Sequence, residues 1–545
     1  MPKPSGSAAG RVLVTAWVIV AAGVIPIPGP AGGTGAAEAG PVDTLTIAYP
    51  LEPDTLNPYA THIPAVGDMG LAEGFVTNDD KMRYIPLLAQ QVPLLSNGGV
   101  RLVGQKMIVT WKLKPGLKWS DGQPVTSADA AFTYQAMIDP AFRVDTRPGW
   151  NLIESIETPD DLTVVATFKT PYSAYVVNTF RFLMPKHILE GKDLNTYTPY
   201  NRNPVLTGPY KVEQWQPGQE LVQVANPYYR GAGQGLPRTR RVVWRFVQDA
   251  NTRINMLRTG EAQVAWLVPF DQIKALQATP NIKVVVYPLN AWMHFDFNLK
   301  RPMWQDVRVR QAVAYAIDKH GIVSNILGGL GTAAGPPMTP LSWAYNPNAY
   351  SQYMYDPAKA KQLLGAAGWT PASNGVLQKD GQAMTFENCN ATGDATQDRV
   401  QQVIQAELRA VGMDMQIRNY SSTVYGEIRV TGKCDTLFHR WKIGAPPLLS
   451  IFYSAEALPP NGLNEDFYIN NDVTAVINQA EQEIDPQKAK ALFWKAQEML
   501  GRDVPSIPIY YMVSATATSS RLAGLTGNPS NAGDGWNIAE WQLTP

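Results

Sequence analysis

Alternating apolar and polar residues predict strands through the first half of the chain. In Asp43–Pro50, Leu45, Ile47 and Tyr49 alternate with threonine and alanine, which is the period-2 pattern of a half-buried strand. The same pattern recurs in the segments "MIVTWKLK", "LTVVATFK", "GPYKVEQW" and "RVVWRFV". The first half is therefore predicted to be rich in β-structure, with a few helices between the strands.

One segment, Val109–Met137, contains two closely spaced sequence signals for turns. Its strand "VTWKLK" is followed by a Pro-Gly pair, which predicts a type II turn. Leu117–Ser120 is then expected to return as the partner strand, and an Asp-Gly pair makes the next turn. Thr126 is expected to cap the helix that follows, with Asp129 three residues on completing a variant of the capping box.

From about residue 300, helical and strand patterns alternate. Val307–Leu327 places apolar residues on one face and predicts one helix. Asp356 is the expected N-cap of a second helix that Gly368 ends, and Asp485-Pro486 begins another in the same way. This order of elements predicts an α/β protein of at least two lobes.

The N-terminus has the features of an export signal. Lys3 and Arg11 precede an uncharged apolar run, Val12–Ile25, and a small-residue pattern ends at Ala39. Residues 1–39 are therefore predicted to be a signal peptide cleaved after Ala39, which leaves an exported, soluble, periplasmic or otherwise extracytoplasmic protein. The alternative is an uncleaved anchor, although a membrane span needs about 20 apolar residues.

Composition narrows the function classes. Of 545 residues, 45% are hydrophobic and 17% charged, which is typical of a folded chain. The 46 basic and 46 acidic residues cancel, so no electrostatic attraction to nucleic acid is predicted. The two cysteines, Cys389 and Cys434, are expected to form a disulfide in an oxidising compartment; the alternative is two buried thiols.

Catalytic and metal motifs are missing from the sequence. There is no G-x-S-x-G, no phosphate-binding loop, no G-x-G-x-x-G and no H-E-x-x-H, and the five histidines are scattered. A triad built from distant residues stays open, but the sequence favours a protein that is not an enzyme. No cluster of methionine, histidine and cysteine predicts a metal site or a cofactor.

Five segments in a fixed order resemble the extracytoplasmic solute-binding proteins of ABC transporters, family 5, the peptide and nickel class. They are "AEGFVTNDDKMRYIPLLAQQVP", "VTWKLKPGLKWSDGQPVTSADAAFTYQ", "NPVLTGPYKVEQWQPGQELVQVANPYY", "DVRVRQAVAYAIDKHGIV" and "YDPAKAKQLLGAAGW". The resemblance spans about residues 44–543.

The resemblance implies a two-lobed periplasmic-binding-protein-like fold that encloses its ligand between the lobes. Lobe I is expected over residues 43–291, with an extra subdomain at about 87–201. Lobe II is expected over residues 292–513, and residues 514–545 return to lobe I. The chain is expected to cross between the lobes at Leu289–Leu299 and again at Ile507–Ser520.

The resemblance also indicates which residues hold the ligand. On the crossover segment, Trp292 and His294 share one strand face. The sequence favours equally a place for this face in the cleft and a place in the hinge core. Trp441 matches a family tryptophan at the cleft, and Phe438 lies near it in sequence. In the first lobe, Ala65, Val66, Thr207 and Gly208 are further candidates, with a structural turn as the alternative for the last two.

One departure from the family bears on the ligand. Peptide-binding members carry an aspartate three residues after that tryptophan, where it pairs with the ammonium of the peptide, and here the position is Gly444. A buried ammonium without a carboxylate partner is costly. Asp68 and Asp296 are possible substitutes.

The predicted function is the binding component of an ABC importer. It captures an oligopeptide or similar small solute and delivers it to the membrane permease, and a monomer is expected. Alternatives are an oligosaccharide-binding member of the family, favoured by the aromatic residues, and a ligand sensor without a transport role.

Overall fold

The computed structural model describes residues 43–61, 65–144, 147–444, 447–460, 462–530 and 532–544. The predicted signal peptide, residues 1–39, lies outside this range, as does His62. In the part of the chain that is described, no helix is both long and apolar enough to span a membrane.

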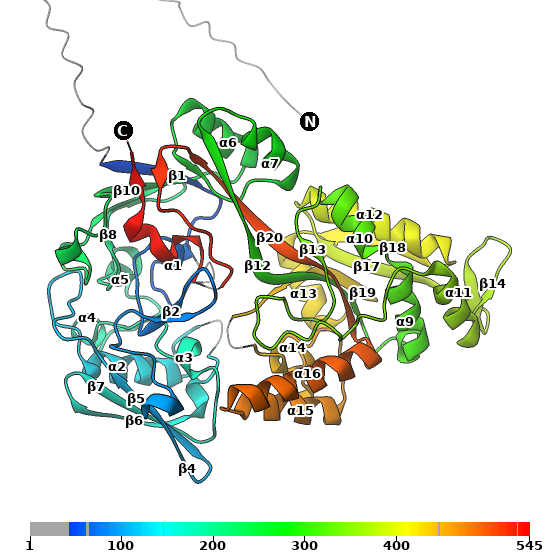
Figure 1. Ribbon diagram of the computed structural model, residues 1–545, viewed down its shortest axis with the longest axis horizontal. Helices are drawn as coiled ribbons and strands as arrows, with labels where there is room; N and C mark the ends of the chain where they lie inside the picture. The colour runs from blue at the N-terminus through cyan, green and yellow to red at the C-terminus, as the bar shows by residue number, and fades with distance from the viewer. Residues whose placement is uncertain are drawn as a thin grey trace, which may run out of the picture. The chain divides into compact units, whose positions relative to one another are not determined.

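One large mixed sheet runs through the molecule (Figure 1). Its strand order is β18-β17-β19-β12-β20-β11-β1-β10-β9-β8, and β13 pairs with β20 outside this path. The strands are β1 (Thr44–Tyr49), β8 (Tyr210–Gln216), β9 (Glu220–Ala225), β10 (Arg241–Phe246), β11 (Val264–Ala265), β12 (Ile282–Phe297), β13 (Thr332–Ala333), β17 (Thr385–Ala391), β18 (Asp414–Tyr420), β19 (Thr436–Lys442) and β20 (Ser506–Ser519). The strand predicted over Asp43–Pro50 is confirmed as β1.

The buried side chains divide the described chain into two main cores. One contains residues between 45 and 266 together with residues 522–543, and the other contains residues between 291 and 512. We call the parts built around these cores lobe I and lobe II. The C-terminal segment thus returns to the lobe in which the described part of the chain begins.

Two long strands connect the lobes: in Figure 1, β12 and β20 run side by side from one half of the molecule to the other. Their antiparallel pairing is interrupted between Pro288 and Trp292, and β19 joins β12 only from Ala291 onward. Asn290 lies at this interruption and is buried. Its backbone N donates to Pro529 O in lobe I at 3.1 Å, and its Nδ2 donates to Ile443 O in lobe II at 3.0 Å. Asn290 therefore connects the crossover to both lobes by hydrogen bonds.

Lobe I contains a second, antiparallel sheet in the order β4-β5-β7-β6. Its strands are β4 (Val100–Val103), β5 (Lys106–Lys112), β6 (Ile153–Asp160) and β7 (Thr163–Phe168). The prediction that Leu117–Ser120 returns as the partner of β5 is wrong. β5 pairs with β4 and β7 instead, and Trp119 is buried in the core while its backbone N bonds Gln123 O within the next turn.

Short two- and three-stranded sheets complete the β-structure. They are formed by β2 (Val76–Asn78), β3 (Tyr84–Pro86), β14 (Thr370–Pro371), β15 (Leu377–Lys379), β16 (Gln382–Ala383), β21 (Leu522–Ala523) and β22 (Gln542–Leu543).

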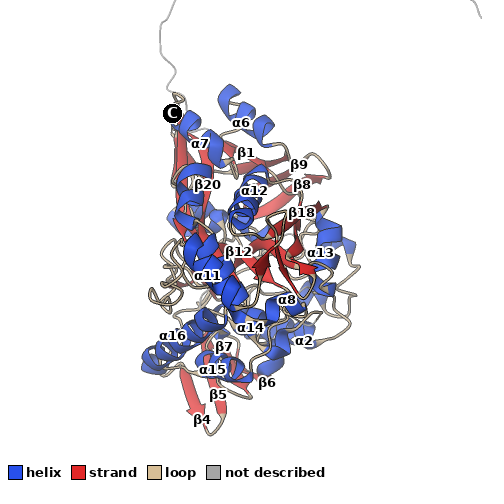
Figure 2. Cartoon of the chain, turned by 90° about the vertical axis from the view of Figure 1, so that its right-hand side faces the viewer, coloured by secondary structure: helices blue, strands red, loops and turns tan. Residues whose placement is uncertain are grey.

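Helices surround the strands, and Figure 2 faces the side on which α11, α12, α15 and α16 lie. The α-helices are α1 (Ala65–Asp68), α2 (Ser127–Ile138), α3 (Tyr175–Asn178), α4 (Lys186–Leu189), α5 (Thr198–Arg202), α6 (Ala250–Thr259), α7 (Phe270–Gln277), α8 (Pro302–Gln305), α9 (Val307–Ala316), α10 (Lys319–Gly321), α11 (Pro357–Ala366), α12 (Ala395–Ala410), α13 (Ser422–Thr431), α14 (Ser450–Tyr453), α15 (Asn471–Gln482) and α16 (Pro486–Asp503). Tighter or wider turns occur at η1 (Leu95–Asn97), η2 (Trp150–Leu152), η3 (Ala232–Gln234), η4 (Ile322–Ile326), η5 (Ala455–Ala457) and η6 (Asp534–Glu540).

The predicted helix starts are confirmed where a side chain caps them. Thr126 and Asp129 form the capping box of α2. Asp356 Oδ1 accepts from Lys359 N at 2.8 Å, and Asp485 caps α16 in the same way. The single helix predicted over Val307–Leu327 is wrong, because α9 ends at Ala316 and the Asp318 side chain caps a new turn by accepting from Gly321 N at 2.8 Å.

Candidate functional site

The sequence candidates on β12 are fully buried inside lobe II. Trp292 and His294 each have 0% of their surface exposed. The register of β12 with β19 puts Trp441 opposite Trp292 and His439 opposite His294, so these four rings share one face of the sheet. Phe438, which is also wholly buried, lies on the other face because neighbouring strand residues alternate.

A buried carboxylate joins the two histidines. Asp296 Oδ1 lies 2.5 Å from His294 Nδ1, and its Oδ2 lies 2.7 Å from His439 Nε2. Burial alone raises the pKa of this carboxyl, but the charges and hydrogen bonds of His294 and His439 hold it well below its usual range. Both oxygens of Asp296 are therefore already bonded, and Asp296 does not replace the aspartate missing at position 444.

The network continues from the histidines to an ion pair. His439 Nε2 lies 3.5 Å from Glu465 Oε2, and Glu465 accepts two hydrogen bonds from Arg429 at 2.8 and 2.7 Å. The guanidinium of Arg429 in turn lies 5.0 Å from the ring centre of Trp441. The histidines, the acids and the arginine together position Trp441, which also contacts the Phe452 ring with centres 4.7 Å apart.

His294, Asp296 and His439 are also one of two groups among the described residues whose donor atoms come close enough to hold a metal ion, all within 4.8 Å of one another. Hydrogen bonds between the imidazoles and the carboxylate account for this closeness without an ion. The other group is Glu387, Cys389 and Cys434, but here the two cysteines form a disulfide with Cα atoms 6.3 Å apart. Sequence reasoning missed the histidine pair because 143 residues separate Asp296 from His439 and only the strand register joins them.

The lobe I candidates support the segment that carries α1. Ala65 begins this helix, and Val66 is buried in the lobe I core. Thr207 Oγ1 donates to Glu73 O at 2.8 Å and accepts from Glu73 N at 3.0 Å. Gly208 N donates to Leu71 O at 2.9 Å. The hydrogen bonds of Thr207 and Gly208 thus hold the segment just after α1 in place.

Replacing Gly208 by alanine is expected to destabilise lobe I by about 1–3 kcal/mol, the cost of overpacking. An added Cβ would lie 2.3 Å from Gly70 O and 2.4 Å from Leu71 C, and both are backbone atoms that cannot rotate away. Urea unfolding measures the change. Gly233→Ala is the matched control, since nothing lies within 4 Å of its added Cβ, and its stability is expected to stay within about 0.5 kcal/mol of wild type. Equal stability of the two variants would contradict the proposed tight contact.

Two carboxylates lie together on the lobe I side. Asp68, at the end of α1, accepts a hydrogen bond from Tyr49 Oη at 2.8 Å, and Asp534, in η6, accepts one from Tyr287 Oη. A Cβ added at Gly533 would fall 1.7 Å from Asp68 Oδ1, so the glycine allows η6 to pack directly on Asp68. Burial and then the charge of Asp534 raise the pKa of Asp68 to about 7.

Two cations lie near this pair. Lys442 is the last residue of β19 in lobe II, and Arg181 belongs to lobe I. The charges of both lower the pKa of Asp68, against the larger effects of burial and of Asp534. Burial lowers the pKa of Lys442, whereas Asp68 and Asp534 oppose this effect.

Lys442 therefore combines an exposed side chain with the pKa shift of a desolvated group. Asp534, Arg181 and Lys442 were not sequence candidates, because only the return of the C-terminal segment and the end of β19 bring them to Asp68.

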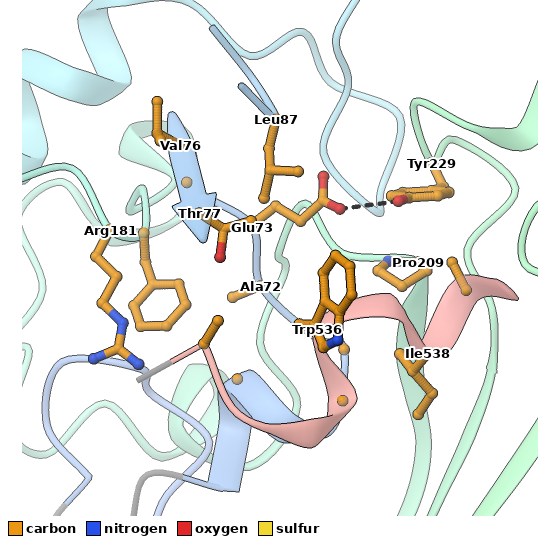
Figure 3. A pocket seen from close by; sticks show the side chains of 17 residues that line it. Ala72, Glu73, Val76, Thr77, Leu87, Arg181, Pro209, Tyr229, Trp536 and Ile538 are labelled. Carbon is orange, nitrogen blue, oxygen red and sulfur yellow. Dashed lines mark hydrogen bonds between the residues drawn. The ribbon is translucent and has the colours of Figure 1, made fainter. Parts of the chain in front are cut away.

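A small cavity lies beside α1 within lobe I (Figure 3). It measures about 70 Å³, whereas pockets for small-molecule ligands measure about 300–1,000 Å³. Its polar wall includes Glu73, which accepts a hydrogen bond from Tyr229 Oη at 2.9 Å and pairs with Arg230. The cavity has room for water but not for a peptide.

Comparison with known proteins identifies relatives in sequence and fold. Residues 85–462 match the family described as bacterial extracellular solute-binding proteins, family 5. The chain is 26% identical to the oligopeptide-binding protein AppA of Bacillus subtilis, over 90% of each chain. It is 29% identical to the glutathione-binding protein GsiB of Pectobacterium atrosepticum, over 83% of this chain and 85% of that one. Among solved structures it resembles NikZ of Campylobacter jejuni in complex with Ni(L-His), with a TM-score of 0.80, 25% identity, and coverage of 92% of this chain and 100% of that one.

Proposed function

The chain belongs to the bacterial extracellular solute-binding proteins of family 5, and from this premise we propose that it captures a short peptide or a similar small solute between its two lobes. The observation that carries this proposal is the division of the chain into two buried cores that the paired strands β12 and β20 connect. A ligand between the lobes is enclosed when they close on it.

The crossover supports hinge closure. The paired strands β12 and β20 connect the two lobes, and their pairing is interrupted between Pro288 and Trp292. Loss of regular pairing at that point allows the lobes to rotate while the sheet in each lobe stays intact.

The relatives and the charges both favour a ligand with an ammonium group. AppA is named for oligopeptides and GsiB for glutathione, and both ligands carry a free amine. In this chain, Asp68 takes the place of the aspartate that is missing at position 444. The oligosaccharide alternative loses support, because Trp292 is buried and Trp441 is covered by Phe452 and His439.

The remaining parts of the function follow the family. We propose that the mature protein is exported, works outside the cytoplasmic membrane as a monomer and delivers its ligand to the permease of an ABC importer. Its role is binding, and no catalytic step is proposed. In the alternative function, a ligand sensor without a transport role, the closed form binds a partner other than the permease.

The first test is binding of a pool of random tripeptides to pentapeptides by the mature protein. The free-ended pool is expected to raise the melting temperature, because a ligand that binds only the folded state stabilises it. The same pool with acetylated N-termini is expected to have little effect, since acetylation removes the ammonium. An equal effect of both pools, or of neither, would contradict the proposed function.

Binding of the free-ended pool is also expected to depend on pH. Because burial and Asp534 raise the pKa of Asp68 to about 7, this carboxyl gains a proton as the pH falls below 7 and loses its attraction for an ammonium. Tyr49, Lys442, Arg181 and Asp534 are the groups that face it. Affinity should fall by up to about tenfold per pH unit below pH 7, and fall again above about pH 8, where the peptide amine loses its proton. Asp68→Asn should flatten the acid side of this profile, and an unchanged profile would contradict the role of Asp68.

A further inference from the structure

The two lobes are also in contact at a place that is separate from the crossover. The backbone N of Ser173 in lobe I donates a hydrogen bond to Glu481 O in lobe II at 3.1 Å. Ser173 comes just before the N-cap of α3, and Glu481 lies in the last turn of α15. In Figure 1 both helices lie below the crossover that β12 and β20 form, so this hydrogen bond joins the lobes outside the hinge.

Two aliphatic side chains accompany this hydrogen bond. Leu448 and Ile484 belong to lobe II by their position in the chain, but both are partly buried against the hydrophobic core of lobe I. Leu449, the residue next to Leu448, is wholly buried in the core of lobe II. Adjacent leucines therefore pack into different lobes, which places the segment just before α14 at the interface between them.

Glu481 holds the lobe II side of the contact together. Its carboxylate accepts hydrogen bonds from Ser450 N at 2.8 Å and from Ser450 Oγ at 2.7 Å. These bonds join the end of α15 to the start of α14, and the side chain of Glu481 is itself buried. Leu448, Glu481 and Ile484 are therefore presented to lobe I as one unit.

The lobe I side of the contact is held by the packing of Tyr172. This residue precedes Ser173 and is buried, and its Oη accepts a hydrogen bond from Asn178 Nδ2 at 2.7 Å. A Cβ added at Gly149 would lie 2.3 Å from Tyr172 Cε1, so the ring is packed directly against the backbone of another segment. The backbone N of Ser173 is therefore a donor in a fixed position.

Opening of the lobes has to break this contact. When two lobes rotate about a hinge, segments outside the hinge separate, and here the hydrogen bond and the burial of Leu448 and Ile484 are lost together. One hydrogen bond and two partly buried side chains make a modest contribution, so the contact can break and form again. A contact of this strength biases the equilibrium between the open and closed forms without locking the protein in one of them.

We propose that the contact of Ser173 with Glu481, together with Leu448 and Ile484, is a latch that holds the lobes closed and slows the release of the ligand. The latch acts through the equilibrium between the closed and open forms, and it requires no particular ligand. This inference rests on the proposed function, in which the lobes close on a solute. It adds a protein contact that sets how long the solute stays enclosed.

The first test measures amide hydrogen exchange of the mature protein without ligand, by mass spectrometry. Leu448→Ala/Ile484→Ala is expected to speed exchange of the lobe I segment around Ser173 at least about fivefold, because the two substitutions weaken the closed form. This segment carries no substitution, so local damage to lobe II would leave its exchange unchanged. Exchange in β1 should stay at the wild-type rate, which checks that lobe I is folded. Equal exchange around Ser173 in wild type and variant overturns the latch.

Ile469→Ala is the matched control. It removes an aliphatic side chain of the same lobe that is 64% exposed and packs against neither of the two main cores. Exchange around Ser173 is expected to stay at the wild-type rate in this variant. An increase as large as that of Leu448→Ala/Ile484→Ala would show that any loss of an aliphatic side chain from lobe II has this effect, and would overturn the latch.

The second test measures release of the free-ended peptide pool by tryptophan fluorescence after rapid dilution. Dissociation is expected to be at least about fivefold faster from Leu448→Ala/Ile484→Ala than from wild type or Ile469→Ala. An unchanged dissociation rate overturns the role of the contact in release. No binding of the pool by wild type overturns the proposed peptide function, whereas the exchange measurement needs no ligand and still decides whether this contact holds the lobes together.

Discussion

Replacing Asp296 by asparagine is expected to lower the free energy of unfolding by about 3–5 kcal/mol. The carboxylate is 3% exposed and accepts from imidazoles on two strands, His294 on β12 and His439 on β19. Asparagine keeps the shape but removes the charge, and its amide places a donor against an imidazole. Urea unfolding followed by circular dichroism at pH 7 measures the loss.

The control for Asp296→Asn is the same substitution at a surface ion pair. Asp414 lies 3.2 Å from Arg409, and both side chains are partly exposed, so Asp414→Asn should cost no more than about 1 kcal/mol. The effect at Asp296 also has a predicted pH dependence. Because His294 and His439 hold its pKa below the usual range despite burial, its stabilising effect is present above about pH 4 and is lost as the pH falls further. A difference between wild type and variant that grows in acid would contradict this account.

Removing the disulfide is expected to cost up to about 4 kcal/mol. The bond between Cys389 and Cys434 closes a loop with a sequence separation of 45 residues, and the chain-entropy estimate for such a loop is about 4 kcal/mol. Cys389 lies on β17 and Cys434 just before β19, two strands that already pair, and both cysteines are buried with Tyr425, Ile428 and Leu437. The bond therefore stabilises the edge of lobe II that holds the histidine network.

The measurement compares urea unfolding of wild type and Cys389→Ala/Cys434→Ala, each with and without dithiothreitol. Reductant should shift wild type toward the double variant and leave the double variant unchanged, which controls for general effects of the reagent. Wild type that is equally stable with and without reductant, after complete reduction is verified by mass spectrometry, would contradict the prediction.

The sequence predicted local structure well wherever a residue's role depends on its neighbours in the chain. The caps at Thr126, Asp356 and Asp485 and the strand at Asp43–Pro50 were of this kind, because a cap or an alternating pattern is complete within a few residues. The same local logic failed for Leu117–Ser120, whose expected partner β5 pairs with strands from elsewhere in the chain. It also failed within Val307–Leu327, where the Asp318 side chain starts a new turn inside an otherwise helical pattern.

The candidate site was predictable only in part. The spacing of Trp292 and His294 correctly put both on one strand face, but the sequence left the hinge core and the cleft equally open to them, and the structure buries both residues in lobe II. Asp68 was named as a substitute for the missing aspartate, whereas nothing in the sequence pointed to Lys442, Arg181 or Asp534. Their approach to Asp68 depends on the crossover and on the return of the chain to lobe I.

By itself, the sequence determined the family, the α/β class, the helix caps and the absence of the aspartate at position 444, because each of these is a property of residue order over short distances. Only the tertiary structure decided that His294 and His439 share Asp296 and that the returning segment at Gly533 packs on Asp68. Asp296 and His439 are 143 residues apart in the chain, and Asp68 and Gly533 lie near opposite ends of the described chain. Electrostatic partners are chosen by proximity in space, and strand register and the crossover between the lobes set that proximity.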